Sequence, residues 1–400
     1  MRTLLAALGD PHLAVPVFHV AGTNGKGSTV ATLEALLRAS GRRVARFTSP
    51  HLVDFRERIV VDGAPIDEAD VSAFVERWLP TADAAGATFF EITTALAFDR
   101  FARAGVDVAV VETGLGGRLD STNVVQPVVA GVTAIGLDHT ELLGDTREQI
   151  AAEKGGIYKA GVPAVVGEPD PAIRRALARQ AGEAGASAVR VVAEECRVAE
   201  VAVTARGTTF RLEAPFGAAR LVTPLLGAFQ AHNAATALTM LDAAGDPWRL
   251  PLARSAEALL SVRLAGRFQR VGRWLFDVAH NPDGARVLGE TLAALRPERP
   301  VAALVTVLAD KDWRGMLEAL APAVDHLVLS VAPTAPAGRV WPLEAAAAFA
   351  AGRGWDAVAE PDFDRALALA AERGRTVLVT GSFHTVGDAM LRLQVDPLAR

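Results

Sequence analysis

The stretch Val20-Ala21-Gly22-Thr23-Asn24-Gly25-Lys26-Gly27-Ser28-Thr29 decides the fold, because it has the composition of a phosphate-binding loop. The apolar residues 15–20 before it predict a buried strand, and residues 28–38 after it predict a helix with leucines on one face. Glycines at such a turn let backbone N–H groups approach phosphate oxygens, while the helix N-terminus and Lys26 supply positive potential. We therefore predict a strand, loop and helix that bind a polyphosphate.

The loop departs from the usual P-loop spacing. Gly22 stands only three residues before Gly25, and Gly27 stands where a magnesium-binding Ser or Thr normally follows the lysine. Ser28 is therefore a weaker candidate metal ligand than its counterpart in other P-loops. The alternative interpretation is a glycine-rich turn with a solvated lysine.

Composition predicts a protein of two domains. Four hundred residues, 50% of them hydrophobic, exceed one ordinary domain. The single cysteine, Cys196, excludes a disulfide framework, and the sequence has neither an export signal nor an apolar run of membrane-spanning length. A net charge of −5 disfavours nucleic acid as a partner. We expect a cytoplasmic protein that binds neither membranes nor nucleic acid.

Lysine usage singles out individual positions. Of 41 basic residues only Lys26, Lys154, Lys159 and Lys311 are lysines, and all others are arginines. A compact ammonium or a reactive amine is needed where arginine cannot serve, because arginine is bulkier and does not lose its proton. Lys154 and Lys311 are therefore candidate functional residues, whereas chance retention accounts for Lys159.

Alternating strand-like and helix-like segments define the first half. Such alternation predicts a mostly parallel sheet covered by helices. The predicted strands are residues 15–20, 44–48, 106–111, 128–135 and 163–166. Short alternating runs within residues 189–222 predict a small antiparallel sheet at the edge of this domain.

The second half predicts a smaller domain. Helices are expected at residues 229–243 and 251–260, before a linker at 263–266. The αβ alternation then resumes, with strands at 274–279, 301–307, 326–331 and 376–380. We predict an α/β protein: a P-loop ATPase-like domain over 1–262 with a mostly parallel sheet and a small antiparallel sheet, and a Rossmann-like α/β domain over 267–400.

Polar residues follow several predicted strands. Glu112 ends one strand, His139 follows another, and Ser49 follows a third. Ligands of open α/β sheets bind at this edge, and Mg²⁺ prefers one or two carboxylates together with phosphate oxygens and water. Glu112 is thus expected to hold Mg²⁺ opposite the loop, with Ser49 in place of the missing P-loop hydroxyl. The alternatives are a turn-capping glutamate and a histidine that is only a hydrogen-bonding polar group.

The second half repeats this pattern. Asp277 and His280 follow a strand, Ser382 follows another, and Arg267 adjoins the linker. These side chains are expected to reach a nucleotide bound across the cleft. The alternative is that they cap loops.

Together these segments resemble the folylpolyglutamate synthase and dihydrofolate synthase family, within the wider group of Mur-type amide ligases. The Lys-Gly-Ser order after the glycines is particular to this family and explains the failed P-loop pattern. The matching motifs are His19-Val20-Ala21-Gly22-Thr23-Asn24-Gly25-Lys26-Gly27-Ser28, Ser49-Pro50-His51-Leu52, Glu112-Thr113-Gly114-Leu115-Gly116-Gly117-Arg118-Leu119-Asp120, Asp138-His139-Thr140, Asp277-Val278-Ala279-His280-Asn281-Pro282 and Gly381-Ser382-Phe383-His384-Thr385.

The resemblance implies ATP-dependent amide formation. A carboxylate of dihydropteroate or of a tetrahydrofolate (poly)glutamate takes the γ-phosphoryl group, and the amine of L-glutamate attacks the acyl phosphate, so that ADP and phosphate leave. Phosphoryl transfer needs mainly positioning and charge neutralisation. We expect a monomer that uses two Mg²⁺ ions.

Roles of individual residues are implied by the same resemblance. Lys26, Glu112, His139 and Lys154 are the expected catalytic residues; Ser49 and Glu112 bind the first Mg²⁺, and His139 and a carbamylated Lys154 bind the second. Arg58 and Ser382 place glutamate, and Phe90, Asp120 and Ser121 form a pterin pocket, although Phe90 is alternatively a core residue. The expected ATP-binding residues are Gly22, Thr23, Asn24, Gly25, Lys26, Gly27, Ser28, Asn233, Arg267, Asp277 and His280.

Two other functions remain open. One is a Mur-type ligase for peptidoglycan precursors, which shares the use of ATP but has a UDP-binding domain for which this chain is too short. The other is a non-enzymatic P-loop module, which leaves Glu112 and His139 unexplained. The family usually has a few dozen residues before the first strand, so we also expect a misassigned start codon or a missing helix, and an uncovered patch on the first domain.

Overall fold

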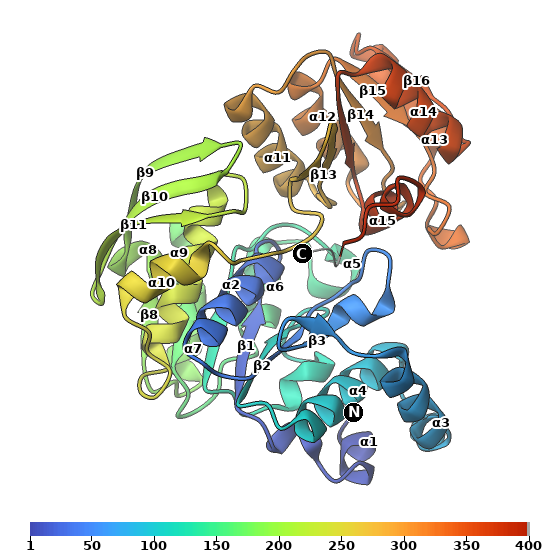
Figure 1. Cartoon of the computed structure of the whole chain (residues 1–400). Coiled ribbons are helices and arrows are strands. Elements are labelled where there is room, and N and C mark those ends of the chain that lie inside the picture. Colours follow the sequence, from blue (N-terminus) through green and yellow to red (C-terminus); the bar gives the residue numbers. More distant parts are fainter. Residues whose placement is uncertain (398–400) are drawn as a thin grey trace.

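The computed structural model describes residues 1–397, and the larger part is built on an eight-stranded sheet (Figure 1). Its inner strands are parallel, and β3 and β4 are antiparallel additions at one edge. In spatial order the strands are β4 (Ala64–Pro65), β3 (Ile59–Val61), β2 (Val44–Phe47), β5 (Val108–Glu112), β1 (Val17–Ala21), β6 (Val129–Val132), β7 (Ala164–Val166) and β8 (Val189–Val191).

Helices cover both faces of this sheet, as the fully buried strands require. Side chains alternate between faces along a strand, so Phe18 packs with one helical layer and Val17 with the other. The helices are α1 (Arg2–Ala7), α2 (Lys26–Ala39), α3 (Glu68–Ala84), α4 (Phe89–Ala104), α5 (Thr140–Leu143), α6 (Arg147–Gly155), α7 (Pro171–Glu183), α8 (Val192–Glu195), α9 (Phe229–Ala243) and α10 (Leu252–Leu259).

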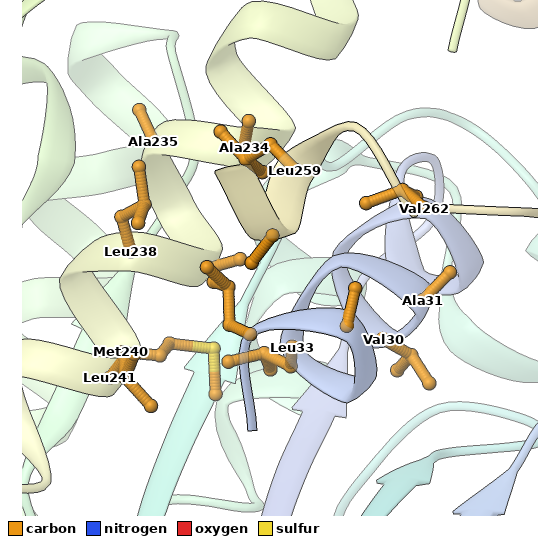
Figure 2. Packing of buried hydrophobic residues seen from close by; sticks show 14 of the residues in the cluster. Val30, Ala31, Leu33, Ala234, Ala235, Leu238, Met240, Leu241, Leu259 and Val262 are labelled. Carbon is orange, nitrogen blue, oxygen red and sulfur yellow. The ribbon is translucent and has the colours of Figure 1, made fainter. Parts of the chain in front are cut away.

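Packing of α2 against α9 and α10 forms the larger core. Figure 2 shows Val30, Ala31 and Leu33 of α2 facing side chains of α9 and α10. Small alanines on α9 let the helices approach closely, and burial of each leucine or valine contributes about 1.5–3 kcal/mol. The core therefore fixes the N-terminus of α2, which follows the glycine-rich loop.

A three-stranded antiparallel sheet, in the order β11-β10-β9, lies beside this domain. Its strands are β9 (Arg197–Thr204), β10 (Gly207–Ala214) and β11 (Gly217–Thr223), which confirms the small sheet predicted from the alternating pattern. The prediction was wrong for residues 189–191, which form β8 at the parallel edge of the large sheet. The crossover helix α7 returns the chain in the direction of β7, so β8 pairs in parallel with it.

A second sheet of six strands carries the C-terminal part. Its core strands are parallel, and β12 pairs antiparallel at one edge. The order is β12 (Gln269–Val271), β13 (Trp274–Phe276), β17 (Thr376–Thr380), β14 (Val301–Val305), β15 (His326–Leu329) and β16 (Ala357–Ala359). Its helices are α11 (Pro282–Leu295), α12 (Trp313–Leu320), α13 (Leu343–Gly352), α14 (Phe363–Arg373) and α15 (Phe383–Arg392).

Short 3₁₀ turns complete the described structure at Pro11–Leu13, Phe55–Arg58, Ser121–Val124, Ala321–Ala323 and Ala337–Arg339. Within residues 1–397 we find no helix that is both long and apolar enough to cross a membrane. The predicted fold class is confirmed. The predicted linker falls between α10 and β12, where the chain passes from one sheet to the other (Figure 1).

Strand register decides where polar groups meet. Val20 of β1 pairs with Glu112 of β5 on one side, and Ala21 pairs with Val132 of β6 on the other. The glycine-rich loop, Glu112 and the segment after β6 therefore emerge at one edge of the sheet, because the carboxyl ends of parallel strands lie together.

Gly22 is expected to tolerate no side chain. Its φ is +147°, and a Cβ there would lie 1.9 Å from Thr133 Oγ1 and 3.2 Å from the Thr133 backbone N. We predict that Gly22→Ala lowers the free energy of unfolding by about 3 kcal/mol, because backbone strain and overlap add.

Gly41→Ala is the matched control in urea unfolding. Gly41 also has a positive φ, +88°, but a Cβ there meets no atom within 4 Å. It is expected to cost about 1 kcal/mol, the strain alone. Equal losses in the two variants would show that overlap with Thr133 is unimportant.

Candidate active site

A cavity of about 1780 Å³ lies between the two sheets. The glycine-rich loop, the ends of β5 and β6 and the start of α6 line it from the larger domain, and the segments after β13 and β14 line it from the smaller one. Ligand sites commonly lie at such interfaces and at strand ends.

The glycine-rich loop presents the N-terminus of α2 to this cavity. Gly25 caps the helix with φ +92°, and a Cβ there would lie 2.5 Å from Asn233 Oδ1. The Lys26 ammonium donates to the Thr23 carbonyl at 3.2 Å and lies 3.8 Å from Glu112 Oε1. Unpaired N–H groups at a helix N-terminus together with a lysine form an anion site.

Glu112 is a buried carboxylate among cations. It ends β5 with 4% of its surface exposed. Burial raises its pKa, although Lys26, Arg267 and the Ser49 backbone N–H oppose that shift. Both Glu112 and Ser49 line the cavity. Oxygen donors beside a phosphate loop suit a divalent cation, which takes its other ligands from phosphates and water.

Asp138 joins the two domains. Its Oδ1 accepts from Lys311 Nζ at 2.5 Å, and its Oδ2 lies 3.3 Å from His280 Nε2. Burial raises the pKa of Asp138, but the hydrogen bond and charge of His280 and the charge of Lys311 outweigh it and hold that pKa well below its usual range. Lysine scarcity had marked Lys311, whereas Asp138 was missed as a site residue although it adjoins His139.

His139 and Lys154 lie on the same side of the cavity. Burial lowers the pKa of His139 to about 4, so the imidazole is neutral near pH 7, the form that binds metals. Burial, with the charge of Lys26 adding to it, lowers the pKa of Lys154 to about 7. The lowered pKa increases the unprotonated fraction of this amine at neutral pH, and the unprotonated amine is the form that reacts with carbon dioxide.

Asp120 holds the loop after β5. Its Oδ2 accepts from the backbone N–H groups of Gly114 at 2.9 Å and Leu115 at 2.8 Å, and its Oδ1 accepts from the backbone and hydroxyl of Thr122. Because Thr122 gives its hydroxyl proton to Asp120, buried His19 must donate to that hydroxyl, at 2.8 Å. Asp120 thus fixes the loop that lines the predicted pocket, and it also lies in the cavity lining.

Of the four other residues predicted to bind the acceptor or glutamate, three line the cavity and Ser382 does not. Phe90 and Ser121 line the cavity, and a Cβ on Gly114 would lie 2.3 Å from Phe90 Cζ, so the tip of the ring packs against the loop at this glycine. Arg58 lines it too and donates to His51 Nδ1 at 2.8 Å. Ser382 is absent from the lining; its buried hydroxyl caps α15 by accepting from the Thr385 N–H.

Residues predicted to bind the nucleotide lie at the cavity, with one exception. Asn233, Arg267, Asp277 and His280 all line it, as do residues 23–28. Asp277 also accepts from the Phe268 and Ala279 N–H groups at 2.9 Å. The bond to Phe268 holds the end of the segment that joins the two domains. Gly22, the first glycine of the loop, is buried and does not line the cavity.

Sequence reasoning missed the pairing of two amides across the cleft. Asn281 Nδ2 donates to Asn24 Oδ1 at 3.1 Å, and Asn24 Nδ2 donates to Asn281 Oδ1 at 3.4 Å. Both residues stand within the motifs at the loop and after β13, which was the available signal. Among residues 1–397, no three His, Cys, Asp or Glu side chains are grouped so as to hold a metal. The predicted sites need fewer protein ligands, since Mg²⁺ keeps waters and phosphates.

Fold and site define a two-domain ATP-dependent ligase with a glycine-rich phosphate loop. The model of the Mur ligase middle domain matches residues 20–241, and that of the Mur ligase glutamate ligase domain matches residues 266–383. The dihydrofolate synthase/folylpolyglutamate synthase of Escherichia coli K12 is 40% identical over 96% of this chain and 88% of its own length. The chain therefore belongs to the folylpolyglutamate synthase and dihydrofolate synthase family of Mur ligases.

Solved structures agree with this assignment. A Mycobacterium tuberculosis folylpolyglutamate synthase complexed with ADP superimposes with a TM-score of 0.91 at 34% identity, covering 99% of this chain and 94% of that one. The E. coli FolC complex with DHPP and ADP gives 0.86 at 36%, with 98% and 92% covered. A Yersinia pestis bifunctional enzyme with AMPPNP and a Mn ion gives 0.85 at 35%, also with 98% and 92% covered.

Asp138 is expected to be important for stability because its ion pair is buried on both sides. We predict that Asp138→Asn lowers the free energy of unfolding by about 3 kcal/mol, since it removes the charge of the carboxylate 2.5 Å from the buried Lys311 ammonium and leaves only Asp310, at 3.9 Å. Urea unfolding of the ligand-free protein measures this.

Glu298→Gln is the control, because it removes one carboxylate from an exposed pair with Arg375 at 2.6 Å. An exposed pair contributes about 0–1 kcal/mol. If Asp138→Asn lowered the free energy of unfolding no more than Glu298→Gln does, the ion pair between Asp138 and Lys311 would contribute nothing to stability.

Proposed function

We propose that this ligase adds L-glutamate to dihydropteroate and also extends the glutamate tail of reduced folates, through an acyl phosphate. One observation carries the proposal: the cavity that holds the phosphate loop, Lys26 and Glu112 also holds Phe90 and the loop shaped by Asp120. A phosphoryl donor and a flat acceptor can thus meet in one enclosure.

Residues at the N-terminus of α2 position the triphosphate. The N–H groups of the loop bind its oxygens, and Lys26 neutralises charge on the γ-phosphoryl group. An acceptor carboxylate oxygen then attacks phosphorus, the bond to the ADP oxygen breaks, and ADP leaves. The glutamate amine attacks the resulting acyl carbon and loses a proton, and phosphate leaves. Asn233, Arg267, Asp277 and His280 bind the nucleotide.

The donor set fits divalent cations at two places. Ser49 and Glu112 would hold one, and His139 with Lys154 would hold the other. The neutral imidazole of His139 and the pKa of Lys154, lowered by burial to about 7, are the states that such a site needs, because an ammonium repels Mg²⁺ whereas a lysine carbamate is an anionic oxygen donor. Bound cations would neutralise charge on the phosphate oxygens. The Mn ion in the Yersinia pestis relative supports such a site.

The acceptor subsites follow from the lining. Phe90 would stack on the pterin ring, Ser121 offers a hydroxyl to the edge of that ring, and Asp120 keeps the loop in place. Arg58 would bind a glutamate carboxylate. Ser382 would act on glutamate only through the start of α15, which it caps. We further propose that the protein works as a cytoplasmic monomer.

ADP release distinguishes the acceptors. We expect turnover that requires both L-glutamate and an acceptor, with dihydropteroate and with tetrahydrofolate. UDP-muramyl substrates and a mixture without an acceptor serve as controls and should give none. With carboxyl-¹⁸O-labelled dihydropteroate, one ¹⁸O should appear in phosphate, because the acyl phosphate carries that oxygen away.

Three results of this assay would contradict parts of the proposal. Turnover with tetrahydrofolate alone would reduce the protein to a folylpolyglutamate synthase. Turnover with UDP-muramyl substrates would assign it to peptidoglycan synthesis. Unlabelled phosphate would exclude the acyl phosphate.

Substitution of Lys154 tests whether this residue acts as a carbamate. Lys154→Ala should lower kcat by about a hundredfold, the size typical of such electrostatic groups, and a short carboxylic acid should restore part of it by supplying an anionic oxygen. Lys154→Arg should not be rescued, since its side chain fills the space. A crystal structure at neutral pH with both metal sites occupied and a bare Lys154 amine would contradict the carbamate.

A further inference from the structure

A buried carboxylate that the proposed mechanism does not use lies beside the cavity. Glu168 follows β7 and is fully buried. Its Oε2 accepts from the Ile135 N–H at 2.5 Å, and its Oε1 accepts from the Asp170 N–H at 2.7 Å and from Arg147 Nη2 at 3.0 Å. Burial raises the pKa of Glu168, although the two N–H groups and Arg147 oppose that shift. Burial of a carboxylate is tolerated when several donors surround it in this way.

Arg147, the first residue of α6, is bound to the same backbone position. Its Nε donates to the Ile135 carbonyl at 2.9 Å, and its Nη1 donates to Asp170 Oδ2 at 3.3 Å. Each of its three guanidinium nitrogens thus donates to the protein, as expected of an arginine that fixes neighbouring segments. We call Glu168 and Arg147 the α6 ion pair. One of its members holds the N–H of Ile135 and the other holds the carbonyl.

The phosphate loop holds the residues on either side of Ile135. The Ala134 carbonyl accepts from the Thr23 N–H at 2.8 Å, and the Gly136 carbonyl accepts from Thr23 Oγ1 at 3.1 Å. Residues 134–136 are therefore fixed between the phosphate loop on one side and the α6 ion pair on the other.

The α6 ion pair connects the two expected ligands of the second cation. His139 follows residues 134–136, and Lys154 stands about two turns after Arg147 and so on the same face of α6. Metal sites depend on surrounding groups that hold their ligands in a fixed geometry. We propose that the α6 ion pair positions His139 and Lys154 for a second divalent cation; this rests on the proposed function, which places that cation there.

The variant Arg147→Met tests the pair, because it removes the guanidinium and keeps an unbranched side chain. Mn²⁺ in the presence of AMPPNP is the probe, and electron paramagnetic resonance of free Mn²⁺ gives the number of ions bound and their dissociation constants. We expect the wild type to bind two ions. Arg147→Met should bind the first ion unchanged and the second about tenfold more weakly, the size typical when groups that support metal ligands are lost.

Arg190→Met is the matched control. Arg190 is also partly buried and paired with two carboxylates, Glu195 at 2.5 Å and Asp242 at 2.9 Å, but it lies outside the cavity lining. This variant should lose stability as Arg147→Met does, and should bind both Mn²⁺ ions as tightly as the wild type. A role of the α6 ion pair in stability alone would leave the second ion unaffected in both variants.

Glu168→Gln examines the other member of the pair and keeps the shape of the side chain, so it also serves if Arg147→Met does not fold. It should weaken the second Mn²⁺ ion alone. Binding of that ion by both variants as tightly as by the control would overturn the inference. Equal weakening of the two ions would also overturn it, because a general disturbance of the site would then be the cause.

Failure of this inference can be told from failure of the proposed function. A wild-type protein that adds glutamate to neither dihydropteroate nor tetrahydrofolate refutes the proposed function. A wild type that binds a single Mn²⁺ ion with AMPPNP refutes the second cation site and this inference with it. An active wild type that binds two ions, with variants of the α6 ion pair that bind both equally tightly, refutes the inference alone.

Discussion

Parallel pairing of β5 and β6 on either side of β1 is the constraint on which the site depends. The backbone register sets Glu112 beside Val20 and Val132 beside Ala21. The phosphate loop, the buried carboxylate and the segment with Asp138 and His139 therefore emerge together. Helix α2 is fixed by its packing against α9 and α10 (Figure 2), so that its N-terminus points into the cavity. Shifting β5 by one residue would turn Glu112 to the opposite face of the sheet.

The second domain completes the site by contributing an ammonium, an imidazole and an amide. Lys311 and His280 meet Asp138, and Asn281 meets Asn24 of the phosphate loop. A buried pair of this kind costs desolvation, and it is favourable only when the partners are held in good geometry. These contacts join the smaller domain to the segment that bears His139. Asp277 also accepts from the Phe268 N–H and so fixes the segment that joins the two domains.

Most of the fold could be predicted because long apolar strands and glycine-rich turns are local signals. Residues 229–243 and 376–380 were predicted to the residue. The strands β3, β4, β12 and β16 were missed, since each has only two or three residues and forms through pairing with a longer neighbour. Such pairing is a tertiary effect that local patterns do not contain.

The sequence predicted the site residues that lie at the ends of strands. It did not predict the hydrogen-bond partners that other segments of the chain supply. Glu112 ends a strand, His139 follows another, and both line the cavity as expected. The hydrogen bonds that satisfy Asp120 and Ser382 were not foreseeable, because a carboxylate or hydroxyl in a loop gives no sign of which backbone groups it will meet.

Replacement of Lys26 tests the central claim most directly, because this ammonium lies where the strand ends converge. Its side chain reaches the cavity from the first residue of α2 and contributes little to the core. The account predicts that Lys26→Ala lowers kcat by about a hundredfold or more and leaves the melting temperature unchanged. A variant that kept more than about a tenth of the wild-type rate would contradict the role of Lys26 in neutralising the transferred phosphoryl group.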